Sequence, residues 1–239
     1  MERRFLGFLA AAAAFVPAVL LLDRDGVLPQ AALFLATTGF LWLFARRSGV
    51  ESRQVVCAVL IASLGEVFLS VICGFYSYRH APVPLYVPPG HGLFYALAIV
   101  TARQEALRRH APLISGGVLA AGSLLAAASF VFFRDALGFG WWLLALSLMV
   151  FSRNRLLLSC CFVYTLLLEV LGTAIGNWRW AAVSPLFGLS AANPPAGVGV
   201  LYILLDLIVV TISGRAGPVT APAAREPLPW GSAADSQAA

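Results

Sequence analysis

The amino-acid sequence predicts an all-α integral membrane protein with eight transmembrane helices, arranged as two parallel four-helix repeats. Hydrophobic residues make up 60% of the 239 positions and charged residues only 11%, far below the roughly 25% typical of soluble domains. Apolar runs long enough for a helix to cross the hydrocarbon core recur along the chain. The same order of features occurs twice: an acid in an apolar run, then an aromatic and proline-rich segment, then a helix that begins with glycines. These observations exclude an ordinary soluble domain.

The first repeat is expected to occupy residues 1–110. Its opening span follows a basic start and is rich in alanine, as in a signal peptide. We interpret it as a retained helix, because the repeat needs a first span there. Pro88 and Pro89 fit the start of the fourth helix. The four spans are expected at about 5–22, 28–45, 55–75 and 89–102.

The second repeat is expected to occupy residues 111–213, with a tight turn at Arg134 and Asp135 between its first two spans. A tail rich in Ala, Pro and Ser, at residues 214–239, is predicted to be disordered and cytoplasmic. The four spans of this repeat are expected at about 113–133, 138–151, 156–176 and 197–213.

Arginine supplies all of the positive side-chain charge, since the chain has no lysine. If both termini are cytoplasmic, twelve arginines lie on the inner side and four, Arg24, Arg79, Arg134 and Arg179, on the outer side. The positive-inside rule therefore predicts a protein of the plasma (inner) membrane with its N-terminus and C-terminus in the cytoplasm. Because the arginines sit in short connecting loops, they indicate topology and not a nucleic-acid partner.

Matching residues at a nearly constant offset of about a hundred positions indicate an internal duplication. Each half has an even number of spans, so both halves enter the membrane from the same side and are related by an axis along the membrane normal. The ordered matches are Phe44-Ala45-Arg46 with Phe151-Ser152-Arg153, Glu66-Val67 with Glu169-Val170, Gly74 with Gly176, Tyr76 and Tyr78 with Trp178 and Trp180, Pro88-Pro89 with Pro194-Pro195, and Gly90, Gly92 and Tyr95 with Gly197, Gly199 and Tyr202.

Three acids lie inside the predicted spans: Glu66, Glu169 and Asp206. A charged carboxylate at bilayer depth costs about 2.5 kcal/mol or more, so each acid is expected to be neutral, paired or hydrated. We interpret all three as candidate catalytic residues that donate or carry a proton, or as anchors for a ligand. The alternative is a structural role, in which a protonated acid forms a hydrogen bond across a helix interface.

A polar stripe is expected on each glycine-led helix, because residues four apart share a helix face. It contains His91 and Tyr95 in the first half, and Tyr202 and Asp206 in the second. We interpret His91, at a helix start, as a candidate catalytic residue, and both tyrosines as groups that orient a substrate. Alternatively, His91 is only solvated at the membrane interface, and Asp206 only bonds a tyrosine or the backbone.

The aromatic segments on the predicted outer side contain two candidate substrate-binding residues, Tyr76 and Trp178. The alternative, which we favour for these aromatics as a group, is a membrane-interface belt that also includes Tyr78 and Trp180.

A cavity is expected beneath the outer segments. The span at 89–102 reaches only about 21 Å, less than the roughly 30 Å of the hydrocarbon core, so residues 76–88 are expected to dip into the outer leaflet. Irregular backbone at that depth is stable only where it is buried or lines a cavity. We expect this cavity to open outward or sideways to lipid, with Glu66, Glu169 and Asp206 as its floor.

No cofactor and no metal site are expected from the sequence. The cysteines lack a CxxC spacing and have no histidine at metal-ligand spacing, so we interpret them as small packing residues. The sequence contains no nucleophile elbow, phosphate-binding loop or zinc-binding helix motif. The cysteines in question are Cys57, Cys73, Cys160 and Cys161.

The favoured functional hypothesis is an intramembrane enzyme that uses buried carboxylic acids on a lipid or isoprenoid, as a cyclase or hydratase does. In size, helical make-up and pair of buried acids, the chain resembles small integral-membrane terpene and carotenoid cyclases or hydratases, although no motif matches residue by residue. The expected partner is a membrane lipid or another hydrophobic small molecule. The alternatives are a proton-coupled transporter or lipid-handling carrier with its site between the halves, and a non-enzymatic scaffold whose acids only bond helices together.

Overall fold

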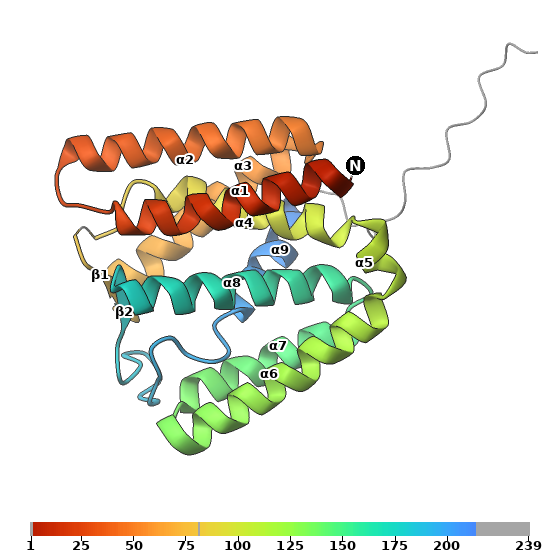
Figure 1. Ribbon diagram of the computed structural model, residues 1–239. Helices are drawn as coiled ribbons and strands as arrows, with labels where there is room; N and C mark the ends of the chain where they lie inside the picture. The colour runs from red at the N-terminus through yellow and green to blue at the C-terminus, as the bar shows by residue number, and fades with distance from the viewer. Residues whose placement is uncertain (1, 81, 214–239) are drawn as a thin grey trace, which may run out of the picture.

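The protein is a bundle of helices with a small antiparallel sheet of two strands at one end (Figure 1). The computed structural model describes residues 2–80 and 82–213, so the predicted tail at 214–239 lies outside the described residues. The elements are α1 (Glu2–Leu21), α2 (Val27–Ser48), α3 (Ser52–Glu66), the π-helix η1 (Val67–Ile72), β1 (Tyr76–Tyr78), α4 (Val87–Ala102), α5 (Glu105–Arg109), α6 (Ala111–Phe133), α7 (Ala136–Phe151), α8 (Arg155–Ile175), β2 (Trp178–Trp180) and α9 (Val200–Ser213).

Four of the described helices are long and apolar enough to cross a membrane: α2, the stretch Ser52–Ile72 formed by α3 and η1, α6 and α8. Large apolar side chains on these helices face outward, including Leu64, which is 71% exposed, and Phe132, which is 78% exposed. So much exposed apolar surface is unfavourable in water. The chain is therefore suited to a membrane.

Each predicted span corresponds to a helix within three residues at either end. The span expected at 55–75 differs in kind, because its regular α-helix ends at Glu66 and continues as the π-helix η1. A short π-helical stretch inserts an extra residue into the helical repeat and is frequent at functional sites. It lies here directly after one of the three candidate acids.

The short helix α4 is enclosed by the protein, between α2, α3 and α8. Every residue from Leu93 to Ala102 is buried. The helix comes close to its neighbours at Gly92, where a Cβ atom would lie 2.6 Å from Val59 and 2.9 Å from Leu41. A helix surrounded by other helices need not match the thickness of the bilayer, which explains how so short an apolar helix fits the bundle.

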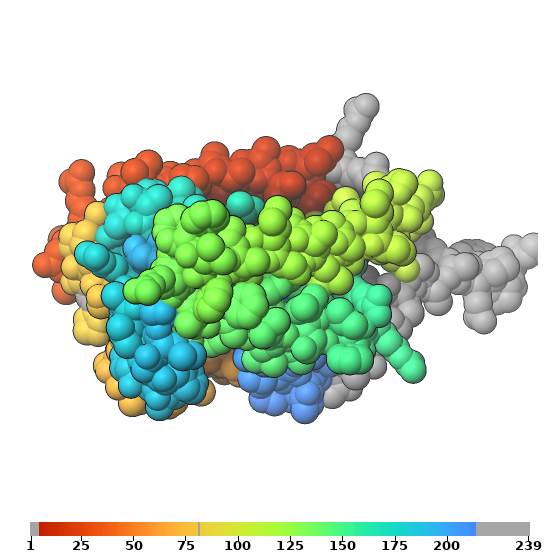
Figure 2. Space-filling model, turned by 90° about the horizontal axis from the view of Figure 1, so that it is seen from below, coloured from red at the N-terminus to blue at the C-terminus, as the bar shows by residue number. Residues whose placement is uncertain are grey.

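The two ends of the bundle differ (Figure 1). The strands β1 and β2 lie at one end, and α5 lies at the other end, on the same side as the start of α1. Gly74 and Gly176, with φ of 67° and 83°, each turn the chain out of a helix and into a strand. The loop between β2 and α9 also covers part of the strand end, beside α6 and α7, which form most of the face seen in Figure 2.

Asp135 fixes that loop to the start of α7. The residue is fully buried, and its carboxylate accepts hydrogen bonds from the Ser129 hydroxyl and from the backbone N–H groups of Gly138, Ala192 and Ala196, all within 3.0 Å. Four donors from three segments satisfy a carboxylate that would otherwise be costly to bury. The turn predicted at Arg134 and Asp135 is therefore also the anchor of the second aromatic segment.

We expect Gly138→Ala to destabilise the protein by about 1–3 kcal/mol, because overpacking a tight contact forces its neighbours apart. A Cβ atom at Gly138 would lie 2.0 Å from Asp135 Oδ2 and 2.5 Å from the Ala196 backbone nitrogen. Thermal unfolding in detergent micelles measures the effect.

Gly140→Ala on the same helix is the matched control, because no atom lies within 4 Å of a Cβ built there. Alanine in a helix is favoured over glycine by roughly 0.5–1 kcal/mol, so this variant should be at least as stable as the parent. An unfolding temperature for Gly138→Ala equal to that of Gly140→Ala would contradict the packing described for α7.

Candidate functional site

Glu66 is a buried acid at the end of α3, surrounded by three hydrogen-bond donors. Its Oε2 accepts hydrogen bonds from the Tyr76 hydroxyl at 2.8 Å and the Tyr78 hydroxyl at 2.7 Å. Its Oε1 lies 2.8 Å from Nε2 of His91. An ionised carboxylate only accepts hydrogen bonds, so these partners suit the ionised form at a depth where an unpaired charge would be very costly.

His91 and Tyr202 connect the helices α4 and α9. Nδ1 of His91 lies 2.5 Å from the Tyr202 hydroxyl. One helical turn further along each helix, the Tyr95 hydroxyl donates a hydrogen bond to Oδ1 of Asp206 at 3.2 Å. The two polar stripes predicted for these helices therefore face each other and form two cross-links, His91 with Tyr202 and Tyr95 with Asp206.

A continuous chain of hydrogen bonds runs through His91. If neutral His91 donates Nε2–H to Glu66, its Nδ1 is free to accept the hydroxyl hydrogen of Tyr202. If His91 is protonated, both ring nitrogens donate instead. Either arrangement joins Tyr202, His91 and Glu66, so a proton can be relayed along this path.

Glu169, the matching acid on α8, is held by two indole groups. Nε1 of Trp178 and Nε1 of Trp180 donate hydrogen bonds to the same carboxyl oxygen, Oε2, at 2.8 and 2.9 Å. Within the described residues, Oε1 of Glu169 has no hydrogen-bond partner. Because an indole N–H only donates, a proton carried by Glu169 sits on Oε1.

The pairing of β1 with β2 places the aromatic donors. Tyr76 lies opposite Trp180, and Tyr78 lies opposite Trp178. Side chains two apart in a strand point to the same face, so all four rings point toward the acids. Gly172 leaves room for one of them, since a Cβ atom there would lie 2.0 Å from the ring of Trp178.

The membrane-belt interpretation of these four aromatics is therefore wrong. Tyr76, Trp178 and Trp180 are buried, and Tyr78 is partly buried. Tyr78 and Trp180 contact the acids as directly as Tyr76 and Trp178, although the sequence-based site includes only the latter two. The signal that identifies the missing pair is the i, i+2 spacing of aromatics, present in both halves.

Two cavities meet at this cluster, and both are bordered by Glu66, His91, Glu169 and Tyr202. The first, which we call the α1-side cavity, has a volume of about 70 Å³. Residues of α1 form part of its wall, and none of the residues that line it is exposed. Its wall includes Phe15, Val16, Val19 and Leu20 of α1, Thr37 of α2, and Tyr78 and Trp178 of the strands.

The second, which we call the α9-side cavity, has a volume of about 170 Å³ and lies between α3 and α9. Apart from the acid cluster and Thr165, its wall is apolar or aromatic. Ile208 at its edge is 44% exposed, so the cavity reaches the outer surface of the bundle. Its wall includes Ile61, Ala62, Gly65 and Leu69 of the first half, and Leu201, Leu204, Leu205 and Ile208 of α9.

The structure brings six of the eight predicted site residues together: Glu66, His91, Glu169, Tyr202, Tyr76 and Trp178. The expectation that Asp206 also lies on the cavity floor is wrong, because Asp206 and Tyr95 line neither cavity. Both are buried one helical turn deeper, where the Tyr95 hydroxyl donates a hydrogen bond to Asp206. The i, i+4 spacing that placed Asp206 on the same helix face as Tyr202 also places it about 6 Å further along the axis.

The donor set of the cluster is that of an acid–base site. No group of three or more His, Cys, Asp or Glu residues that could hold a metal ion occurs among residues 2–80 and 82–213. The cluster combines the carboxyl group of Glu66 with one imidazole and three phenols that are joined by hydrogen bonds, and a second carboxyl group, Glu169, borders the same cavities. These groups can donate, accept and relay protons.

Tyrosine titration tests the arrangement at the strands. Burial, and then the negative charge of Glu66, raises the pKa of Tyr76 and Tyr78 well above 10. The folded protein should therefore keep these phenols protonated at about pH 11, whereas the unfolded chain ionises them near pH 10. Stability should be retained up to about pH 10 and fall at higher pH, because only the unfolded state releases these protons.

The measurement is tyrosinate absorbance against pH, with and without denaturant, on the parent and on Tyr78→Phe. The variant should lose one of the groups that ionise only on unfolding. Ionisation of all six tyrosines near pH 10 in the folded protein would contradict the contacts with Glu66.

No protein-family model, no curated protein and no solved structure matches this chain.

Proposed function

We propose that this chain is an intramembrane enzyme that performs acid–base chemistry on a lipid or isoprenoid. The observation that carries the proposal is the pair of carboxyl groups beside His91, both bordering an apolar cavity that reaches the outer surface of the bundle. Carboxylic acids in an apolar site can protonate an alkene or an epoxide, and the aromatic faces around them can stabilise a cation.

The hydrogen bonds favour different roles for the two glutamates. Glu66 accepts from three donors, so it suits the base that receives a proton. Glu169 has one oxygen free to carry a proton at the cavity, so it suits the acid. The sequence analysis made both glutamates candidates for donating or carrying a proton, and we now propose Glu169 as the acid and Glu66 as the base.

The proposed reaction begins when Oε1–H of Glu169 transfers its proton to one carbon of a substrate double bond. The two π electrons form the new C–H bond and leave a carbocation, which Tyr76 and Trp180 stabilise with their ring faces. A second double bond or a water molecule then attacks the cation. The Glu66–His91 pair takes up the proton that is lost, so the sequence is redox-neutral and yields a cyclised or hydrated product.

The α9-side cavity suits a substrate that arrives from the bilayer. It lies between α3 and α9 and reaches the surface at Ile208, and α3 also carries exposed apolar side chains such as Leu64. The α1-side cavity is covered by α1 and reaches the same four groups from the other side. We therefore propose that the hydrophobic chain enters beside α9, and that the α1-side cavity takes no part in its entry.

The proposed setting is a plasma membrane protein with eight spans in two parallel repeats, with both termini cytoplasmic. The symmetric register of β1 and β2 supports the repeat, because Tyr76 pairs with Trp180 as Tyr78 pairs with Trp178. Each half also bonds its own glutamate to its own aromatic pair. Both strands lie at the end of the bundle opposite α5. Two parallel repeats require this, because their equivalent segments lie on the same side of the membrane.

A proton-coupled carrier is the second candidate, because further polar pairs lie beyond the acid cluster along α4. Tyr95 bonds Asp206 one turn deeper, and Thr101 lies 2.8 Å from the Tyr164 hydroxyl further still. These pairs are separated by buried apolar residues such as Leu97 and Ile99. The interruptions favour the enzyme, and a measurement of transport can distinguish the two.

We expect Glu169→Gln and Glu66→Gln each to lower turnover about 10²- to 10⁴-fold, the usual contribution of a positioned acid or base. The assay incubates the purified protein in liposomes with an acyclic polyprenyl or carotenoid substrate in D₂O, and mass spectrometry detects the product. Protonation at carbon places solvent deuterium on the product, so the label reports the proposed first step.

Glu105→Gln is the control, since Glu105 is an exposed acid on α5 that contacts only arginines of its own helix. It should keep parental activity. A product that forms at the parental rate in both site variants would rule out Glu169 as the acid and Glu66 as the base, and no product from the parent protein would rule out the enzyme. Substrate flux that follows a pH gradient without any product would favour the carrier, and variants that change only stability would favour a scaffold.

A further inference from the structure

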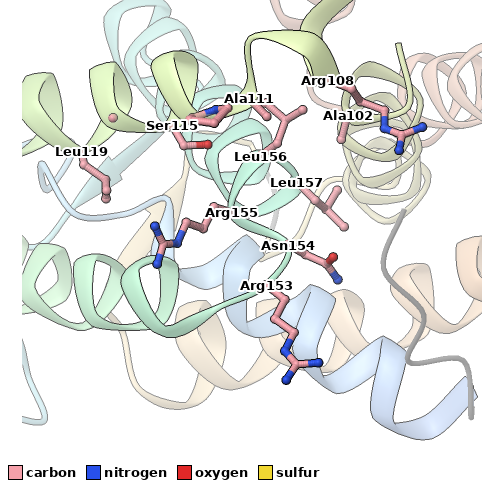
Figure 3. Close-up of a pocket in the computed structure, with 12 residues that line it drawn as sticks. Ala102, Arg108, Ala111, Ser115, Leu119, Arg153, Asn154, Arg155, Leu156 and Leu157 are labelled. Atoms are coloured by element: carbon pink, nitrogen blue, oxygen red, sulfur yellow. The ribbon is translucent and has the colours of Figure 1, made fainter. Parts of the chain in front are cut away.

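A third cavity, larger than the two at the acid cluster, lies far from that cluster at the α5 end of the bundle (Figure 3). Its volume is about 380 Å³. The end of α4, the helices α5 and α6, and the connection from α7 to α8 surround it. The cavity lies at the end of the bundle that the arginine distribution predicts to be cytoplasmic. Several helices end at this level, where lipid headgroups are expected.

Among the described residues, three arginines and no acid line this cavity: Arg108 from α5, Arg153 from the connection before α8, and Arg155 at the start of α8. Figure 3 shows their guanidinium groups spread around the cavity and not gathered at one point. Arg155 donates one hydrogen bond to the Val150 carbonyl, and Arg108 lies 4.0 Å from Glu105. Most of their donors therefore remain free for a ligand of opposite charge.

Two long helices begin at the cavity. α6 starts at Ala111, and α8 starts at Arg155, and neither start is capped by a side chain. The first N–H groups of a helix have no partner within the helix, and they attract anions. Leu156 and Leu157, in the first turn of α8, form part of the cavity wall, which brings these N–H groups to its edge.

Ser115 gives an independent indication of a ligand. Its side chain is on the cavity wall and only 3% exposed, yet its hydroxyl has no hydrogen-bond partner in the part of the chain that the structure describes. Figure 3 shows its oxygen directed toward Leu156 at the start of α8. A buried hydroxyl without a partner is unfavourable, so a ligand oxygen that accepts its hydrogen would be stabilised there.

We propose that this cavity binds a phosphate group. A phosphate carries negative charge, which balances the positive charge of the arginines. Its several oxygens can also accept hydrogen bonds from guanidinium, hydroxyl and helix-start N–H groups at the same time. Apart from Asn154, the rest of the wall, including Ala102, Leu119 and Leu157, is apolar and suits the chains of an anionic phospholipid. A soluble phosphate compound offers the same oxygens without the chains.

The test measures binding to the full chain in detergent micelles, by native mass spectrometry and by the shift of the unfolding temperature. The probes are phosphatidylglycerol, a diacylglycerol with the same chains and no phosphate, and inorganic pyrophosphate. Phosphatidylglycerol should bind at least about tenfold more tightly than the diacylglycerol, and Arg108→Gln should weaken it about tenfold, as expected for the loss of a charge-assisted hydrogen bond.

Arg109→Gln is the matched control, because Arg109 is the neighbouring arginine on α5, is 72% exposed and does not line the cavity. Ser115→Ala should weaken binding several-fold without lowering the stability of the ligand-free protein. Binding of phosphatidylglycerol alone identifies a lipid site, and equal binding of pyrophosphate identifies a soluble ligand. Equal loss in Arg108→Gln and Arg109→Gln, or no preference for the phosphate-bearing probes, would overturn the proposal.

Discussion

The burial of Glu66 is the constraint on which the arrangement of this protein depends. A carboxylate removed from water is stable only if donors replace the water. Those donors come from β1 and from α4, which both follow Glu66 in the sequence. β1 is held in turn by β2 of the second half. The acid therefore needs both halves in place, and the strands at the end of the bundle serve the buried site.

α4 shows how this constraint extends to the core. The helix is short and nearly fully buried because His91 at its start must reach Glu66 on α3 and Tyr202 on α9 together. The packing at Gly92 brings α4 close enough to α2 and α3 for this contact. The helix α4 thus holds polar side chains of the site and is enclosed by longer apolar helices. Those longer helices supply the outward apolar surface.

The sequence predicted most of the residues that form this site, but not which of them contact one another. Glu66 and Glu169 are evident because an acid inside an apolar run is costly, and the two helix starts are evident from their prolines and glycines. Which groups meet depends on how the helices pack, and packing does not follow from the spacing of residues along one helix. For that reason Asp206 was expected in the cavity, where it does not lie, and Tyr78 and Trp180 were assigned to a belt. The π-helix after Glu66 leaves no signal in the apolar pattern, since Val67, Phe68 and Leu69 would suit an α-helix equally well.

Matching positions in the two halves carry chemically different partners, and this difference supports separate roles for the two glutamates. Glu66 is bonded to phenols and an imidazole, which can give up or accept a proton. Glu169 is bonded to two indole N–H groups, which are donors only and do not exchange a proton near neutral pH. A proton that reaches Glu66 can therefore move on through His91 to Tyr202, whereas a proton on Glu169 sits on Oε1, which has no hydrogen-bond partner among the described residues. That oxygen belongs to a residue bordering both cavities, so the proton of Glu169 is directed to whatever occupies them and not into the protein.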